Sequence, residues 1–470
     1  MPTTPSSAPR RGRAALAAAA AALLAACVDF SGPNLSENPN QPSRATSNQL
    51  LTGVTSFAGA GLTADHNRAI SVWMQQMAGT GRQWLNIDAP YDIVEGTLGG
   101  YDTFYVGGGL VDLRTIQANA RADNDQVYLG IAQVWEALIM QHVADWWGDV
   151  PYREAINPDI RTPKLDPQQQ VYADLQLKLD SAITNLAGAG SGPGPFDLIY
   201  GGDKGKWTRL ARTRKARLFL HTAERVPGAY ALALAQANQG LAAPGGGDDF
   251  RTYQSSTVGE ENQWFQFRRE RATDISVGAY VVNLLGARTI GGADPRLPRY
   301  VGTVGGRFDG ADPGEEGESF SWLSAERANP GFRQPLVTWA ENQLIKAEAL
   351  LQTGDAAGAL RELNLERTQA GLSAVPSGLT SAQLYQQIME EKYVALFQNP
   401  EVWSDYKRTC WPNLSQLNGA RSIPARVIYG LSERGANPNV PAPNAAPRRN
   451  WNDPANATAL DGTVCLGQRP

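Results

Sequence analysis

The segment "AEALLQTGDAAGAL" (residues 347–360) decides the fold, because it joins two apolar, alanine-rich helical patterns through a Gly-Asp turn. Glycine can adopt the left-handed conformation that ends a helix, and an aspartate favours the first position of the next one. The flanking stretches 336–352 and 355–370 each place small and branched apolar residues on one face. Together they predict a helical hairpin of the tetratricopeptide kind.

Two comparable hairpins precede this one. Residues 128–147 pair with a helix expected to begin at Asp166-Pro167, an acidic cap followed by a proline suited to the first turn. Residues 206–225 pair with 230–241. The hairpins recur at irregular intervals, so we expect an interrupted array over about 128–241 and 336–408.

A further helix is expected to open at Thr380. Gln383 follows three residues later, which is the spacing of a capping box. The helix should then run to about Phe397.

Two long segments break the helical pattern. Residues 242–335 are rich in Gly, Asp and Pro and contain "ENQWFQF" (261–267), and residues 66–105 are aromatic-rich and broken by glycines. Loop regions of this length inside a compact protein are usually functional. Beyond residue 408 the helical pattern ends, which predicts an irregular C-terminal tail over residues 409–470.

The segment "VADWWGDVPYREA" (residues 143–155) has two possible roles. Its tryptophans are either exposed as a surface on which a ligand stacks or buried as a plug that closes the helical core. It ends a helix that is apolar on most faces, and such a helix must be buried on most sides. Gly148 supplies a C-terminal turn, and Pro151 prevents continuation. We therefore expect Trp146 and Trp147 to close the core.

The N-terminal residues predict export and a lipid anchor. Arg10, Arg11 and Arg13 precede an Ala/Leu run that is too short to span a bilayer, which is typical of a signal peptide over residues 1–26. The run ends in Leu-Ala-Ala-Cys, the form of a bacterial lipobox, so Cys27 is the expected site of lipidation. The alternative is an ordinary signal peptide with an incidental cysteine.

Three cysteines are too few for a disulfide framework. With Cys27 acylated, Cys410 and Cys465 remain as a pair in an oxidising compartment. A bond between them would stabilise the fold by about 4 kcal/mol in the chain-entropy model. The alternative is two separately buried thiols.

Composition restricts the possible partners. The net charge is −4 and no basic block stands out, which argues against nucleic acid. Trp, Tyr and Phe number 12, 15 and 12, more than a bare helical scaffold needs.

The order and spacing of several segments resemble the SusD/RagB family of outer-membrane nutrient-binding lipoproteins, in its SusD-like branch. The segments are "ENPNQPSRATSNQLL", "WWGDVPYREA", "TPKLDPQQQVYADLQLKLDSAITNL", "KWTRLARTRKARL", "DPRLPRY", "AENQLIKAEALLQTGDAAGAL", "EEKYVALFQNPEVWSDYKRT" and "SIPARVIYGLSE". One departure is Cys410, where the family would place a glycine or a similar turn residue.

The resemblance implies a mainly α fold: a right-handed superhelix of tetratricopeptide-like hairpins carrying a large, irregular, loop-rich second subdomain, over residues 27–470. It also implies a lipid-anchored outer-membrane protein that faces the cell exterior. Such a protein captures an oligomeric nutrient, with a glycan favoured over a peptide, for a SusC-like TonB-dependent transporter. We expect no enzymatic activity, cofactor or metal.

Ligand contacts are expected where aromatic and polar side chains alternate on loops, because sugars are held by ring faces and by amides, carboxylates and arginines. Each tryptophan alone is more often a packing residue. The candidates are Arg82, Trp84, Asn86, Tyr91 and Trp264.

A helical glycoside hydrolase is a weaker alternative. It would need two carboxylates about 5–10 Å apart across the scissile bond. Glu390-Glu391 lies on a helix face that is either solvated or arginine-paired, and Asp145 lies in the structural segment. The pairs His142-x-x-Asp145 and His221-x-x-Glu224 have helix-face spacing, but each lacks a third metal ligand.

A tetratricopeptide-type scaffold without a ligand of its own is the remaining alternative, since such arrays commonly bind proteins. A scaffold would bury Trp84 and Trp264 in its core. Exposure of these two side chains therefore discriminates between a nutrient-binding protein and a scaffold.

Overall fold

The computed structural model describes residues 45–88, 91, 93–414, 423–447 and 449–453. The chain divides into two units, residues 1–49 and residues 50–470. In the first unit, Thr46 accepts a hydrogen bond from the backbone N–H of Gln49 at the start of helix α2 (Ser47–Gly61). The second unit holds the remaining elements and is described below. The lipidation and signal-peptide predictions, including Cys27, fall outside the described residues.

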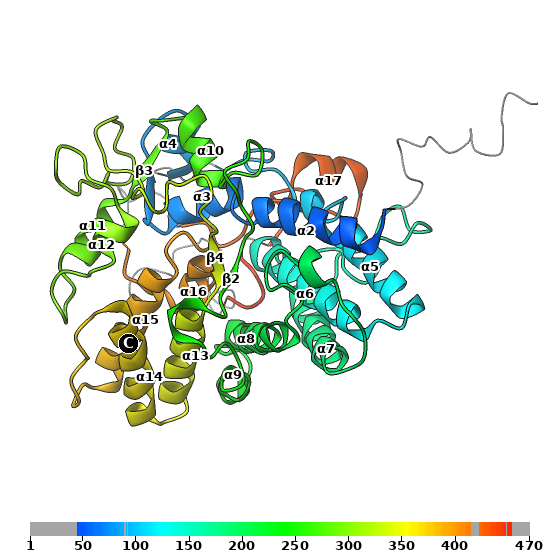
Figure 1. The fold of residues 1–470 in the computed structure, drawn as a ribbon. Coiled ribbons are helices and arrows are strands. Elements are labelled where there is room, and N and C mark those ends of the chain that lie inside the picture. The colour runs from blue at the N-terminus through cyan, green and yellow to red at the C-terminus, as the bar shows by residue number, and fades with distance from the viewer. Residues whose placement is uncertain (1–44, 89–90, 92, 415–422, 448, 454–470) are drawn as a thin grey trace, which may run out of the picture. The chain divides into compact units, whose positions relative to one another are not determined.

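Helical hairpins make up the core of the second unit (Figure 1). Neighbouring pairs pack in sequence order, and α8 links the first hairpin to the later ones through α9 and α13. The fold class predicted from the sequence, mainly α with tetratricopeptide-like hairpins, is confirmed. The helices of this part are α5 (Leu110–Ala122), α6 (Gln126–Trp147), α7 (Gln168–Leu186), α8 (Lys204–Thr222), α9 (Ala229–Ala237), α13 (Trp339–Gln352), α14 (Ala356–Ala370), α15 (Ser381–Ala395), α16 (Glu401–Thr409) and α17 (Leu431–Ala436).

Short polar side chains fix where these helices begin. Asp355 caps α14 by accepting from the N–H of Gly358, directly after Gly354 at φ 94°. Thr380 and Gln383 form the predicted capping box of α15.

The cap expected at Asp166 is wrong. Helix α7 begins at Gln168, after Pro167. The Asp166 carboxylate instead accepts from the N–H groups of Tyr152 and Arg153 at 2.9 and 2.8 Å. Asp166 therefore holds the loop that follows α6 against the start of α7.

Helix α6 is buried over nearly its whole length, as predicted from its apolar circumference. Trp146 and Trp147 are fully buried, and Gly148 ends the helix at φ 78°. The interpretation of the two tryptophans as a core plug is confirmed. The ring of His66 stacks on Trp146 with centroids 5.1 Å apart.

The described part of the C-terminal tail covers this end of α6. The N–H of Val427 donates to the Trp146 carbonyl at 2.8 Å, and the Trp147 indole donates to the Ile428 carbonyl at 3.2 Å. Tyr429 donates to the Asp149 carbonyl at 2.6 Å. The irregular tail thus binds to the first hairpin through specific hydrogen bonds.

The loop-rich part contains short elements joined by two small antiparallel sheets. Strand β1 pairs with β3, with Met77 opposite Val277, and β2 pairs with β4, with Phe250 opposite Val337. The elements are α3 (Asp65–Trp73), β1 (Met77–Gly79), α4 (Gln83–Asp88), η1 (Tyr101–Phe104), η2 (Gly194–Phe196), η3 (Pro244–Gly246), β2 (Phe250–Arg251), α10 (Gln263–Glu270), β3 (Ile275–Val277), α11 (Ala279–Gly286), α12 (Leu297–Tyr300) and β4 (Pro335–Val337). The β1–β3 pairing joins the two long interruptions seen in the sequence.

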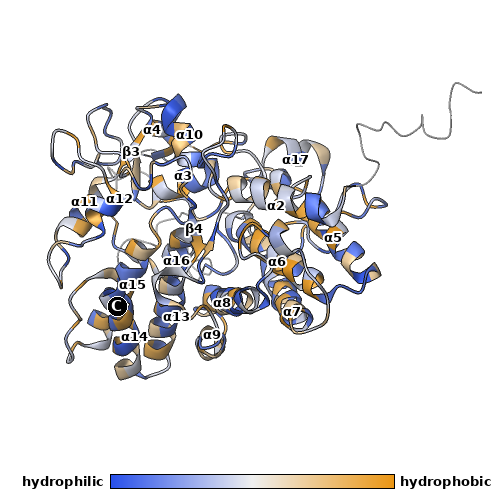
Figure 2. Cartoon of the chain, viewed as in Figure 1, coloured by the Kyte–Doolittle hydropathy of each residue, from blue (hydrophilic) through white to orange (hydrophobic). Residues whose placement is uncertain are grey.

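Buried ion networks replace apolar contacts at several helix interfaces. Helix α8 shows blue stretches in Figure 2, although Arg214 and Arg217 on it are fully buried. Glu391 on α15 is also fully buried, where it accepts from Arg288 at 2.9 Å and from Arg367 at 3.1 Å, and it pairs with Arg296 as well. The sequence predicted that Glu390-Glu391 is either solvated or paired with arginines. For Glu391 the pairing with arginines is correct.

Cys410 follows α16 in the left-handed conformation, at φ 59°. That conformation favours glycine, which accounts for the expectation of a turn residue at this position. Cys410 is disulfide-bonded. Cys465 lies outside the described residues, so the Cys410–Cys465 pairing stays a prediction.

Candidate functional site

The segments predicted to carry ligand contacts meet in one place. Helix α4 follows β1 and helix α10 precedes β3, so the β1–β3 pairing brings α4 and α10 together beside α3 (Figure 1). Trp84 of α4 contacts Phe267 of α10, with the ring centroids 5.5 Å apart and the rings nearly perpendicular. This contact packs the two helices against each other.

A cavity of about 270 Å³ lies between the three helices, and we refer to it as the α3–α4–α10 cavity. Its lining combines carboxylates, arginines and amides over a few apolar groups. The lining residues are Asp65, Arg68, Gln83, Trp84, Ile87, Thr97, Leu98, Gln263, Gln266, Phe267, Glu270 and Arg271.

Arg68 holds one wall of the cavity in place. Its guanidinium donates to Asp65 at 2.6 and 3.2 Å and to the Gln263 carbonyl at 3.1 Å. It also lies over the Phe267 ring, 4.7 Å from the centroid. Burial lowers the pKa of Arg68, while Asp65 opposes that shift. The residue is a structural bridge between α3 and α10.

Polar groups at the cavity mouth remain available to a ligand. Gln83 is exposed and makes no hydrogen bond or ion pair with another described residue. Glu270 is largely exposed, and the half-buried guanidinium of Arg271 lies 3.7 Å from the Asp274 carboxylate. An amide, a carboxylate and a guanidinium can hydrogen-bond hydroxyl and amide groups.

The two predicted tryptophans lie differently from what we expected. Trp84 is 3% exposed and Trp264 is 0% exposed, and both belong to helices, not to loops. Trp264 packs against Trp322 with centroids 6.0 Å apart. The expectation of exposed ring faces is wrong, because these short helices turn the indoles into the core.

The remaining candidates lie around the same helix. Arg82, with its side chain 64% exposed, lies 3.4 Å from the buried carboxylate of Asp274. Asn86 is exposed, whereas Tyr91 is buried. Ligand contact by Arg82 and Asn86 stays a prediction.

Asp88 anchors the floor beneath α4. Its carboxylate accepts from the N–H groups of Gly79 and Gly314, both at 3.0 Å. Burial raises its pKa to about 7, although both hydrogen bonds oppose the shift. The Gly314 partner lies 226 positions away in the chain, so no local sequence pattern indicates this role.

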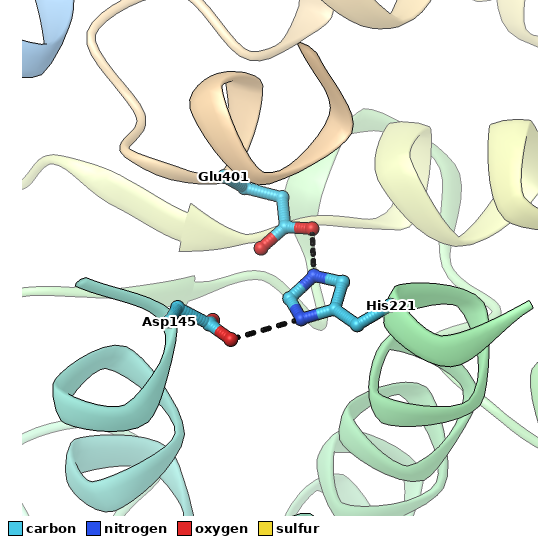
Figure 3. Close-up of side chains that lie close together, drawn as sticks. All are labelled: Asp145, His221 and Glu401. Carbon is cyan, nitrogen blue, oxygen red and sulfur yellow. Dashed lines mark hydrogen bonds and ion pairs between the residues drawn. The ribbon is translucent and has the colours of Figure 1, made fainter. Parts of the chain in front are cut away.

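A second group of titratable residues, Asp145, His221 and Glu401, tests the possibility of a metal site (Figure 3). Asp145 comes from α6, His221 from α8 and Glu401 from α16. The His221 Nδ1 lies 3.0 Å from Asp145 Oδ1, and Nε2 lies 2.5 Å from Glu401 Oε1. All three residues are buried. The sequence paired His142 with Asp145 and His221 with Glu224 by helix spacing. In the structure His221 instead contacts Asp145 and Glu401, and no sequence pattern indicates Glu401.

The protonation state decides what this cluster does. Burial favours a neutral imidazole, but the two carboxylates outweigh it and raise the pKa of His221 to about 9. Both ring nitrogens then donate to carboxylates, so neither has a lone pair for a metal. Arg217, 3.4 Å from Glu401, adds another positive charge beside the cluster. The arrangement is an ion centre that joins three helices.

The structure is mainly helical, and three short helices of its loop-rich part enclose an open cavity. The sequence matches the SusD-like family described as "Starch-binding associating with outer membrane" over residues 39–430. The chain therefore belongs to the SusD-like family, whose members are binding proteins associated with the outer membrane.

Solved structures share this fold. A SusD/RagB family protein from Bacteroides thetaiotaomicron is 21% identical with a TM-score of 0.68, covering 91% of this chain and 100% of that one. A chitin-binding SusD homolog from Flavobacterium johnsoniae is 19% identical with a TM-score of 0.71, covering 86% and 98%. No curated protein sequence matches the chain. Among the described residues, none of the helices combines the length and apolar character needed to cross a bilayer.

Proposed function

We propose that this protein is a lipid-anchored, outward-facing protein of the outer membrane that captures an oligomeric nutrient. The nutrient is a glycan, taken up at the α3–α4–α10 cavity and passed without chemistry to a SusC-like TonB-dependent transporter. The observation that carries this proposal is the meeting of two separately predicted polar segments, from α4 and α10, around one open cavity. A structural neighbour named as chitin-binding supports a glycan as the ligand class.

The cavity suits capture and release. Gln83 and Glu270 at its mouth are exposed, while the rings of Trp84 and Phe267 pack edge to face against each other. Binding then depends on a few hydrogen bonds at the mouth, which corresponds to a dissociation constant of about micromolar to millimolar. A ligand held this weakly can leave again.

The first test uses two sets of oligosaccharides, from chitin and from starch, with the soluble domain and with an Arg271→Ala variant. We expect saturable binding of one set, weakened about tenfold by Arg271→Ala, with no turnover of the sugar. Arg361→Ala, at an exposed arginine of α14 outside the cavity lining, is the matched control and should bind like the wild type. Turnover of a sugar would contradict the proposal.

The second test concerns anchoring and partner. Replacing Cys27 with Ala should move the protein from the membrane to the soluble fraction. Purification from native membranes in mild detergent should recover a TonB-dependent transporter with the wild type. Recovery without any such transporter would contradict the proposed delivery step.

A ligand-free scaffold of the outer membrane is the second candidate. Burial of Trp84 and Trp264 favours it, because a scaffold uses these rings as core. Absence of binding to every oligosaccharide and peptide oligomer, together with recovery of a protein partner, would establish the scaffold instead.

A further inference from the structure

A groove on the helical face has a lining that the proposed nutrient site does not use. Helices α5 and α7 both pack on α6, and between them lies a cavity of about 560 Å³. We refer to it as the α5–α7 groove. Arg114, Gln117 and Arg121 line it from α5, and Leu177 and Lys178 line it from α7.

A buried acid of α6 lies at the floor of the groove. Glu136 accepts hydrogen bonds from Gln117 at 2.5 Å and from Tyr152 at 3.0 Å. Lys178 lies 3.3 Å and Arg114 lies 3.6 Å from the same carboxylate. Burial would raise the pKa of Glu136, but the two cations outweigh it, so the pKa is lowered. The acid is therefore ionised and fixes both cations at the floor.

The walls of the groove carry more positive than negative charge. Arg153 is paired with Asp174 through two hydrogen bonds, at 2.7 and 2.9 Å. Arg121 is exposed, and its guanidinium makes no hydrogen bond or ion pair with another described residue. Four cations line the groove, and three carboxylates lie against its lining residues: Asp174, the buried Glu136, and Asp166 on the backbone N–H of Arg153. One positive charge is left at the groove, that of Arg121, although the chain as a whole carries −4.

An apolar side chain stands beside these charges. Leu177 is 67% exposed on α7, one residue before Lys178. A free inorganic anion would gain nothing from an exposed leucine, whereas a polypeptide can place an apolar side chain on it and an acidic one on the cations. The combination of cations with an exposed leucine therefore favours an acidic polypeptide over a free inorganic anion.

We propose that the α5–α7 groove is a docking site for an acidic segment of a partner polypeptide, with carboxylates on Arg121 and Lys178 and an aliphatic side chain on Leu177. Charge complementarity carries the choice of an acidic partner, and Leu177 carries the choice of a polypeptide. The site is on the hairpins and separate from the α3–α4–α10 cavity. Nutrient binding can therefore fail while docking persists.

The test is an array of ten-residue peptides, each with one leucine and two glutamates at varied spacing, against counterparts with glutamine in place of glutamate. We expect a subset of the acidic peptides to bind the soluble domain, and their glutamine counterparts not to bind. Affinity should fall as salt rises from about 50 to 200 mM, because exposed charges are then screened. If no acidic peptide binds better than its glutamine counterpart, the proposal is overturned.

Two variants locate the binding without touching Glu136. Arg121→Glu and Leu177→Asp should each weaken the selected peptides at least tenfold, with the circular dichroism spectrum unchanged. Arg361→Glu makes the same charge change at an exposed arginine of α14, outside the groove, and should have less than a twofold effect. Equal losses in Arg361→Glu and Arg121→Glu would show non-specific attraction and overturn the site. Displacement of the peptides by millimolar inorganic phosphate, with Leu177→Asp unaffected, would identify a small-anion site and overturn the polypeptide partner.

Discussion

The buried centre around His221 and the α3–α4–α10 cavity both contain charged and aromatic residues. They differ in how many of their polar side-chain atoms already have a hydrogen-bond partner. At the buried centre, both nitrogens of His221 are occupied by Asp145 and Glu401. At the cavity, Gln83 remains without a partner among the described residues, and Glu270 is exposed. The first region joins helices, and the second can receive a ligand.

Clustering of histidine and carboxylate side chains therefore does not by itself identify a binding or catalytic site in this fold. Burial with complete pairing gives a structural role even to a His–Asp–Glu group. Partial pairing at an open cavity is the better indicator of binding. Variants in the two regions should therefore separate stability from affinity.

The largest effect is expected from His221→Ala. The change leaves Asp145 and Glu401 buried without the imidazolium, and breaking a buried ion pair in this way costs about 3–5 kcal/mol. Urea denaturation measures the loss in the free energy of unfolding. Arg361→Ala removes an exposed guanidinium, and the buried Glu362 keeps Lys346 at 2.7 Å, so this control should cost less than about 1 kcal/mol.

A double variant sharpens this result. Adding Glu401→Gln to His221→Ala removes one of the two leftover charges and should restore part of the lost stability. A loss below about 1 kcal/mol in His221→Ala alone would show that the centre is not a structural junction.

A slightly smaller loss is expected from Trp264→Ala. The ring is 0% exposed, and truncation of a buried tryptophan costs about 3 kcal/mol or more. The variant should unfold at a lower urea concentration, and its folded fraction should still bind sugar. Lost affinity at unchanged stability would instead restore the stacking role expected from the sequence.

The helical half could be predicted because its signals are local. The turn at Gly354-Asp355, the capping box at Thr380 and the apolar circumference of α6 each depend on residues a few positions apart. Trp146 and Trp147 were placed correctly by the same reasoning. The one wrong cap, Asp166, failed because a loop N–H competed for its carboxylate.

The site could be predicted only in part, because its geometry depends on partners far apart in the chain. The β1–β3 pairing joins Met77 with Val277, and no local pattern indicates that choice. The same holds for Glu401, which lies 180 positions from His221. The sequence therefore identified the segments of the cavity but not which side chains face it.

The pH dependence of stability should be smaller than either truncation. The folded-state pKa of His221 is raised from 6.5 to about 9, so the folded protein binds more protons than the unfolded chain between those values. The stabilisation is fully present below pH 6.5 and is lost as pH rises through 9, a total fall of about 3 kcal/mol, of which about 2 kcal/mol lies between pH 6.5 and 8.

Other buried groups limit the pH range in which the contribution of His221 to stability can be measured. Burial lowers the pKa of Lys407 to about 8, which opposes the His221 slope above that pH. Burial also lowers the pKa values of His66 and His142, to about 4 and 3, so stability falls again under acid conditions. Urea titrations at pH 6.5–8 should show a negative slope in the wild type and a flatter one in His221→Gln. Parallel slopes would mean that His221 is neutral in the folded protein.

The smallest effect on stability, and the one that most sharply separates the two regions, is expected from Gln83→Ala. Gln83 is exposed, so its removal should change the free energy of unfolding by no more than about 0.5 kcal/mol. Its amide faces the cavity, and loss of one ligand hydrogen bond should cost about 1 kcal/mol of binding, or roughly fivefold in affinity. Gln386→Ala, on α15 and outside the cavity lining, is the amide control for affinity and should leave it unchanged; its own hydrogen bond to Glu390 makes it unsuitable as a stability control. Calorimetric titration with the oligosaccharide that binds the wild type measures both. Unchanged affinity in Gln83→Ala, together with a weakened Gln386→Ala, would place the ligand on the hairpins and remove the distinction between a sealed helical half and an open ligand side.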